Sequence, residues 1–159
     1  MRRKDKEIKD RSIIEKIIID AEICRLAMSD GNIPYIVPMN FGYKEDCLYF
    51  HCAKEGRKLD IIRKNPIVCF QVDTQNEIVK AQKPCEWSMK YYSVIGYGKA
   101  DILEDYQAKK EALNVIMSKY TNEDTFDYKE SAINSIAIIK VWINELSGKV
   151  SGHKNATGS

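Results

Sequence analysis

The sequence predicts a mainly β fold, an antiparallel barrel with flanking helices, in a single domain. Short apolar segments separated by polar turns, such as Asp30-Gly31-Asn32 and Lys44-Glu45-Asp46, are typical of antiparallel strands joined in sequence order. The strand–helix–strand alternation that marks a parallel sheet is absent from the sequence. A length of 159 residues, 44% of them hydrophobic, is sufficient for one domain with its own core.

The first half of the chain begins with a charged arm and a helix. Residues 1–11 carry mostly charged side chains, and we expect them to be solvated or to pack on a partner subunit. Ser12 and Glu15 have the spacing of a capping box, and the isoleucines around them share one helical face, which predicts a helix over 12–22. Three strands are then expected over Cys24–Ser29, Ile33–Tyr43 and Cys47–Cys52.

The second half is expected to contain two helices and four strands. A helix is expected to open at Gly56-Arg57-Lys58 and to end at Asn65-Pro66, because proline stops a helix. Gly96 and Gly98 indicate a bulge, a bend or a close approach of a ligand within a long strand. Asp105 can cap a further helix, and a polar loop follows it over 122–134. The expected strands are Ile67–Val72, a short edge at Ile78–Val79, Ser93–Leu103 and Ile136–Leu146.

Composition and charge exclude several classes of protein. The chain has 25 Lys and Arg against 23 Asp and Glu, so its net charge of +2 is too balanced for a protein that follows nucleic-acid phosphates. No apolar run approaches the roughly 20 residues of a membrane-spanning helix, and the charged start lacks the apolar core of a secretory signal. We therefore expect a cytoplasmic protein without nucleic-acid or membrane partners, with one domain over 1–150 and a flexible tail over 151–159.

Motifs of the common nucleophilic and nucleotide-binding enzymes are missing. There is no Walker loop, no glycine-rich dinucleotide fingerprint before a helix and no G-x-S-x-G elbow. His51 precedes Cys52 on an expected strand, where neighbours face opposite sides, so a Cys–His nucleophile is not expected. His51 alone is either a hydrogen-bonded structural residue or a functional one. No metal site is expected, because the cysteines form no C-x-x-C pair; they are Cys24, Cys47, Cys52, Cys69 and Cys85.

The segment from His51 to Lys58 carries the sharpest local signal. A strand ends, Gly56 follows, and Arg57 and Lys58 stand at the start of a helix, where free amides and the helix dipole favour an anion. Arg57 can hold a phosphate through two hydrogen bonds, and Lys58 adds a point charge. The segment is therefore either a phosphate site or an exposed helix start with incidental cations. An aromatic stretch has two interpretations as well, packing or a wall beside a flat ring; it contains Trp87, Tyr91, Tyr92 and Tyr97.

Taken together, segments along nearly the whole chain resemble one family. The sequence is similar to the nitroimidazole-resistance (Nim-type) branch of the pyridoxamine 5′-phosphate oxidase-like FMN-binding split barrels. The matching segments run in order and are Met1–Ile8, Pro34–Tyr43, Leu48–Ala53, Glu55–Leu59, Cys69-Phe70, Cys85–Trp87, Tyr92–Ala100 and Glu145–Lys149.

The resemblance implies a six-stranded antiparallel split β-barrel that forms a homodimer with FMN in a cleft between the subunits. It assigns the FMN phosphate to Gly56, Arg57 and Lys58, and it places His51 beside the flavin as the catalytic residue. Other positions are implied to line or touch the cofactor, and the whole cofactor-binding set is Pro38, Met39, Asn40, His51, Cys52, Ala53, Gly56, Arg57, Lys58 and Ser93.

The expected function is that of an FMN-dependent oxidoreductase, with a separate electron donor and a small aromatic or nitro compound as substrate. No protein nucleophile is then required, since the flavin carries the electrons. Vitamin B6 oxidation is not expected, because the chain ends on Ile143–Lys149 and a tail instead of the arginine-rich segment of those oxidases. The alternative is a non-catalytic split barrel that binds flavin or haem, and a plain interaction domain is a third reading.

Overall fold

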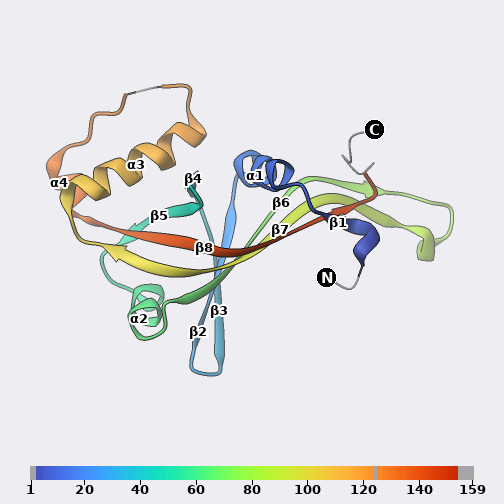
Figure 1. The fold of residues 1–159 in the computed structure, drawn as a ribbon, viewed down its shortest axis with the longest axis horizontal. Coiled ribbons are helices and arrows are strands. Elements are labelled where there is room, and N and C mark those ends of the chain that lie inside the picture. Colours follow the sequence, from blue (N-terminus) through green and yellow to red (C-terminus); the bar gives the residue numbers. More distant parts are fainter. Residues whose placement is uncertain (1–2, 124, 154–159) are drawn as a thin grey trace.

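The computed structural model describes residues 3–123 and 125–153 and confirms the expected fold class, an antiparallel sheet with flanking helices (Figure 1). The strands are β1 Glu7–Ile8, β2 Cys24–Asp30, β3 Ile33–Met39, β4 Gly42–Lys44, β5 Cys47–Ala53, β6 Ile67–Val79, β7 Ser88–Leu103 and β8 Ile136–Ser151. The helices are α1 Arg11–Asp20, α2 Arg57–Lys64, α3 Tyr106–Tyr120 and α4 Glu130–Asn134, with 3₁₀ turns at Lys4–Lys6 and Pro84–Glu86.

The sheet is curled but not closed. Its strands follow the order β3-β2-β6-β7-β8-β5-β4, and β1 pairs with β8 outside this path. Six of these strands are long, and β1 and β4 are short additions, which agrees with the expected six-stranded split barrel. Within the described residues, no helix combines the length and apolarity needed to cross a bilayer.

Alternating side chains build the core inside the curled sheet. Leu26, Phe50, Phe70, Val94 and Val141 are fully buried and come from five different strands. Each such side chain contributes roughly 1.5–3 kcal/mol by leaving water. The outer face of the same strands is much more exposed, as the period of two requires.

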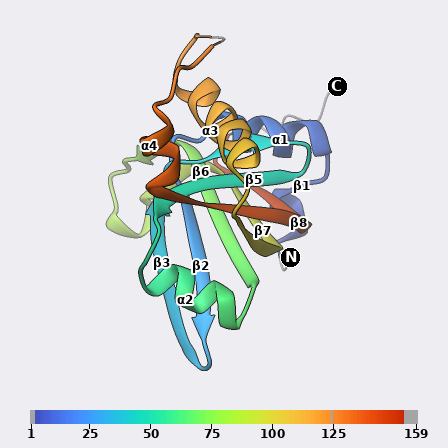
Figure 2. The same ribbon diagram turned by 90° about the vertical axis from the view of Figure 1, so that its left-hand side faces the viewer.

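Helix α3 lies over β4 and β5, whereas α2 lies against β2 and β7 on the other side of the molecule (Figures 1 and 2). Helix α2 buries Leu59, Ile61 and Ile62 in the main core. Helix α3 packs on the outer side, where Ile116 and Ile138 belong to a separate small cluster. The candidate site therefore lies where β5 leaves the sheet and enters α2.

The glycines of β7 mark a tight approach within the protein. A side chain at Gly96 would overlap the Phe70 ring, and one at Gly98 would overlap the carbonyl oxygen of Trp142. The pairing of β7 with β8 shifts register between Tyr97 and Gly98. The expected bulge is therefore present, and the neighbours of these glycines are residues of the core and of β8.

The cap of α1 differs from the predicted capping box. The helix begins at Arg11, and the carboxylate of Asp10 accepts a hydrogen bond from the backbone N–H of Ser12 at 2.9 Å. Glu15 forms an ion pair with Arg11 at 2.8 Å instead of reaching back to the cap. The prediction was wrong because Asp10 supplies the acceptor two residues earlier than Ser12 would.

Long-range pairing explains the other differences from the sequence-based elements. The N-terminal arm is partly ordered, because β1 pairs Glu7 and Ile8 with the end of β8. Strand β6 continues to Val79 through an irregularity between Thr74 and Glu77, where a break was expected. The extended segment at 33–43 is interrupted between β3 and β4, and the expected loop at 122–134 contains α4.

Residues near the C-terminus also pack on the sheet. Ser151 ends β8, so the expected tail over 151–159 starts inside a strand. The ring of His153 stacks on Tyr92 with 4.8 Å between centroids, and its Nε2 lies 3.0 Å from the carbonyl oxygen of Gln75. Residues 154–159 lie outside the described part of the chain.

Candidate functional site

Strand β5 carries three of the predicted site residues, on alternating faces. His51 and Ala53 are exposed, and Cys52 between them is buried with 8% of its surface accessible. His51 pairs with Ile138 of β8, so its ring lies on the outer side of the sheet. Within the described residues no hydrogen bond holds the His51 ring, which leaves it available to a ligand.

The Cys52 thiol is a core group and not a nucleophile. Burial raises the pKa of the Cys52 thiol, and the nearby charge of Lys58 opposes this rise to a smaller extent. A thiol with a raised pKa carries little thiolate, which is the reactive form. Cys52 therefore supports the wall of the site from inside, while His51 faces outward.

Gly56 makes the sharp turn between β5 and α2. Its φ of 135° lies in a region that side chains other than hydrogen rarely allow. The carbonyl oxygen of Gly56 accepts the first helical hydrogen bonds, from the N–H groups of Leu59 and Asp60. No side chain within the described chain caps this end of the helix, so the amides of the first turn can bind an anion.

Arg57 and Lys58 place two cations at this uncapped helix end. The guanidinium carbon of Arg57 lies 4.8 Å from the centre of the Tyr35 ring on β3, within range of a cation–π interaction. Arg57 is exposed and Lys58 is half-buried. The stacking on Tyr35, which the sequence did not suggest, fixes the guanidinium in the space between α2 and β3.

Pro38, Met39 and Asn40 lie where β3 ends. Pro38 is exposed on the outer face, and Met39 packs against the core. The next residue after Asn40 is Phe41, whose backbone N–H donates to the Tyr120 hydroxyl at 3.0 Å. That hydroxyl donates in turn to the carbonyl oxygen of Glu22 at 2.7 Å. A tyrosine from α3 thus fixes the break between β3 and β4.

Ser93 lies apart from the helix end. Ser93 is the register partner of Asp73 on β6. Tyr35, which Arg57 contacts, lies nearly level with Cys69 of the same strand, four residues before Asp73. Four residues of extended strand span on the order of 13 Å. One copy of the chain therefore brings the start of α2 together with Tyr35 of β3, but it does not bring Ser93 to that place.

The outer face of the sheet exposes large apolar side chains. Ile36 is 60% exposed, Ile95 44%, Tyr97 52% and Trp142 50%. Large apolar patches on soluble proteins usually mark an interaction site. The sequence carried only a short signal for this face, the outward-facing Ile95 and Tyr97 between polar outward residues of β7.

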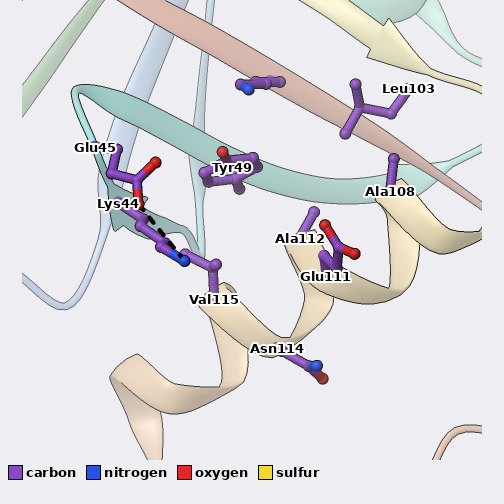
Figure 3. A pocket seen from close by; sticks show the side chains of 10 residues that line it. Lys44, Glu45, Tyr49, Leu103, Ala108, Glu111, Ala112, Asn114 and Val115 are labelled. Carbon is purple, nitrogen blue, oxygen red and sulfur yellow. Dashed lines mark ion pairs between the residues drawn. The ribbon is translucent and has the colours of Figure 1, made fainter.

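A pocket that the sequence did not suggest lies between α3 and the outer side of β5 (Figure 3). Its volume is about 490 Å³, and its walls include Tyr49, Leu103, Glu111 and Lys140. Burial is the largest cause that raises the pKa of Tyr49 to about 12. Tyr49 precedes His51 by two residues, so both side chains leave the same face of β5.

The sequence profile of the family described as "Pyridoxamine 5′-phosphate oxidase" matches residues 10–150. No protein of curated function gives a significant match to the chain.

Solved structures with the same fold include one similar protein and several more distant ones. A protein from Bacteroides thetaiotaomicron, provisionally assigned to 5-nitroimidazole antibiotic resistance, is 36% identical, with a TM-score of 0.81 over 91% of this chain and 86% of that one. A flavocytochrome from Azotobacter vinelandii is 19% identical, with a TM-score of 0.83 over 96% of this chain and 72% of its own. An FAD- and haem-binding protein from Mycobacterium smegmatis is 17% identical, with a TM-score of 0.82 over 93% and 74%.

Proposed function

Because this chain belongs to the pyridoxamine 5′-phosphate oxidase family, we propose that it is an FMN-dependent oxidoreductase that reduces a small aromatic or nitro compound. The observation that carries the proposal is the uncapped start of α2, with Gly56, Arg57 and Lys58, directly after the outward-facing His51. The similarity to the Bacteroides protein supports a nitro compound as the substrate class.

The residues at the start of α2 fit the phosphate of FMN. Free amides, the positive end of the helix dipole and two cations meet at the start of α2. A Cβ at Gly56 would meet no atom of the described residues within 4 Å, so the space beside this turn is open. Arg57 would hold two phosphate oxygens, while its stacking on Tyr35 limits the rotation of the guanidinium. Lys58, whose charge also acts on the Cys52 thiol, would add a second positive charge beside the phosphate.

The flavin would supply the electron transfer, receiving electrons from a nicotinamide cofactor or a reduced flavoprotein. His51 would polarise the substrate or give it a proton, because its exposed ring carries nitrogen donors that can reach a bound molecule. The exposed ring of His51 and the wall formed by β5 would orient the substrate on the outer face of the strand.

A homodimer with the cofactor between the subunits forms part of this proposal. The exposed apolar side chains Ile36, Ile95, Tyr97 and Trp142 support it, since a second copy would remove them from water. Ser93 and Pro38 lie on that outer face, away from Arg57. A partner subunit would bring such residues to the flavin that Arg57 holds.

The second candidate is a binding protein without turnover. Two distant neighbours favour it, because one is named as a flavocytochrome and the other as an FAD- and haem-binding protein. These likenesses, at 19% and 17% identity, concern the fold alone. Absorption spectra of the purified protein separate flavin from haem, and oxidation of a reductant separates an enzyme from a binding protein.

The test measures FMN binding and reductant consumption with a nitroaromatic substrate. The wild type is expected to bind one FMN per chain and to oxidise the reductant faster when the nitro compound is present. His51→Ala is expected to retain FMN and to lose about 100-fold in turnover, the range of one proton-transfer residue. His153→Ala, which changes the other histidine of the chain, is the matched control and is expected to keep full turnover.

Three outcomes would contradict the proposal. Absence of FMN uptake would remove the cofactor assignment, and a haem spectrum in place of flavin would favour the second candidate. Stoichiometric FMN without any reductant consumption would leave only the binding role. Unchanged turnover of His51→Ala would remove the catalytic role of that residue.

A further inference from the structure

Cations and hydroxyls cluster where β1, β7 and β8 meet, beside both described ends of the chain (Figure 1). The ammonium of Lys149 donates to the Tyr91 hydroxyl at 2.6 Å, and the ammonium of Lys6 donates to Ser151 Oγ at 3.0 Å. Tyr91 and Ser151 are register partners, so their side chains share one face. We call Lys6, Tyr91, Lys149 and Ser151 the Tyr91 cluster.

The Tyr91 cluster has more hydrogen-bond donors than acceptors. The Tyr91 oxygen accepts a hydrogen bond from Lys149, and its own hydrogen can still be donated to an acceptor. Each ammonium has three hydrogens and no lone pair. The pKa of the Tyr91 hydroxyl is lowered, first by the hydrogen bond from Lys149 and then by the charges of Lys149 and Lys6, against the opposing effect of burial.

Two carboxylates lie near the cluster and bear on its charge. Glu7 of β1 is the register partner of Lys149. Asp5 forms an ion pair with Arg3 at 2.5 Å, and the charge of Lys6 also acts on the Asp5 carboxylate. Lys6, Tyr91 and Lys149 are partly buried residues, and the lower local dielectric strengthens their interaction with an anion that binds there.

We infer that the Tyr91 cluster binds an oxyanion, a phosphate group presented free or on a small molecule. Two phosphate oxygens can accept from Lys6 and Lys149, and a third can accept the free hydrogen of Tyr91. The site lies far from the start of α2, and the inference does not rest on flavin chemistry.

The experiment titrates the protein with inorganic phosphate and follows the ionisation of Tyr91. The ultraviolet signal of Tyr91 is the difference between the wild type and Tyr91→Phe, because the chain has nine tyrosines. Bound phosphate cancels part of the positive field, so it is expected to raise the midpoint of Tyr91 ionisation. Potassium chloride at equal ionic strength is the control for screening.

Calorimetry at neutral pH gives the second readout, with Arg57→Ala and Lys58→Ala as the common background so that the start of α2 does not contribute phosphate binding. Lys149→Met is expected to weaken phosphate binding at least tenfold and to remove the phosphate-dependent shift of the midpoint. Lys99→Met, an exposed lysine on the same strand as Tyr91, is the matched control and is expected to bind phosphate like the wild type. Lys6→Met provides a second variant from another segment, should Lys149→Met unfold.

Ribose 5-phosphate distinguishes the two sources of the oxyanion. Binding at least tenfold tighter than that of inorganic phosphate identifies the phosphate as part of a larger ligand, whereas equal binding identifies free phosphate. Either result supports the site. The inference is overturned if neither compound binds, or if chloride shifts the midpoint as much as phosphate does, or if Lys99→Met loses as much affinity as Lys149→Met.

Discussion

The two ends of the sheet carry cationic sites that are built in different ways. At the α2 end, His51, Gly56, Arg57 and Lys58 come from one continuous stretch of chain. In the Tyr91 cluster, Lys6 and Ser151 meet across 145 positions of sequence. The first site follows from a strand, a turn and a helix start, while the second exists only when three strands pair in the right register.

This difference decides what can destroy each site. The α2 site depends on a local turn and on its own side chains, so changes elsewhere in the sheet are expected to leave it intact. The Tyr91 cluster depends on β1 remaining docked on β8, so any change that loosens this pairing is expected to remove it. Substitutions at the two ends should therefore separate FMN binding from phosphate binding.

The largest expected effect is on FMN binding at the α2 end. The double variant Arg57→Ala with Lys58→Ala is expected to weaken FMN binding at least 100-fold, about 2.7 kcal/mol, because hydrogen bonds to charged groups contribute roughly 1.5–3 kcal/mol each. Thermal stability is expected to change little, since both side chains point away from the core. Equilibrium titration with FMN measures the affinity.

The matched control lies at the other end of the same helix. Arg63→Ala with Lys64→Ala removes the same charge from the last turn of α2 and is expected to leave FMN binding unchanged. If both double variants lose affinity equally, the phosphate is held by overall charge and not by the start of the helix. Phosphate binding at the Tyr91 cluster is expected to be the same in both.

The sequence was informative where neighbouring residues make the structure. The strand before Gly56, the helix after it and the opposite orientations of His51 and Cys52 all follow from short-range rules. The stacking of Arg57 on Tyr35 could not be predicted, because it requires the path of β3 across the barrel. The overall fold came from the family resemblance together with the spacing of strands.

The sequence was least informative where distant segments pair. The charged arm gave no sign that Glu7 and Ile8 would add a strand to β8, because two residues are too few to show a pattern. The long ends of β7 and β8, which carry Tyr91 and Lys149, extend beyond the predicted strands for the same reason. Their mutual pairing, and not local propensity, holds them in place.

Gly148→Val is expected to have the next largest effect. A Cβ at Gly148 would lie 2.9 Å from Ile14 Cγ1 and 3.0 Å from Ile8 Cβ, so β1 and α1 must shift. Such overpacking costs about 1–3 kcal/mol of unfolding free energy. Urea unfolding measures this cost, and calorimetry is expected to show that phosphate binding weakens while FMN binding is retained.

Ser147→Val is the matched control for Gly148→Val. Ser147 is exposed on the same strand, so the larger side chain meets no core atom and is expected to change stability by less than about 0.5 kcal/mol. Equal destabilisation by both substitutions would show that β8 tolerates no valine here and that the contact with β1 is not responsible.

Tyr120→Phe is expected to cost about 1–2 kcal/mol of stability. The hydroxyl accepts from the Phe41 N–H at 3.0 Å and donates to the Glu22 carbonyl at 2.7 Å, and its removal leaves a partly buried N–H without its partner. Chemical denaturation measures the loss, and Tyr106→Phe, an exposed tyrosine of the same helix, is the control. Because Phe41 follows Asn40, a weaker FMN affinity would extend the α2 site to the end of β3.

The smallest effect contrasts two tyrosines whose ionisation shifts in opposite directions. Burial raises the pKa of Tyr49, two residues before His51, to about 12, and the hydrogen bond from Lys149 lowers the pKa of Tyr91. Ultraviolet titration of the native protein should therefore show Tyr91 ionising before the ordinary tyrosines and Tyr49 after them. Tyr91→Phe should remove the earliest step, and Tyr49→Phe should remove the latest.

The same shifts give opposite contributions to stability in alkaline solution. Above pH 10 the unfolded chain ionises Tyr49 while the folded chain does not, so this contribution is lost as the pH rises from 10 towards 12. For Tyr91 the folded chain ionises first, so stability is gained as the pH rises through its lowered pKa towards 10. If Tyr91→Phe leaves the pH dependence below 10 unchanged, the ammonium of Lys149 does not act on the phenol in solution, and the contrast between the two ends would then rest on β1 docking alone.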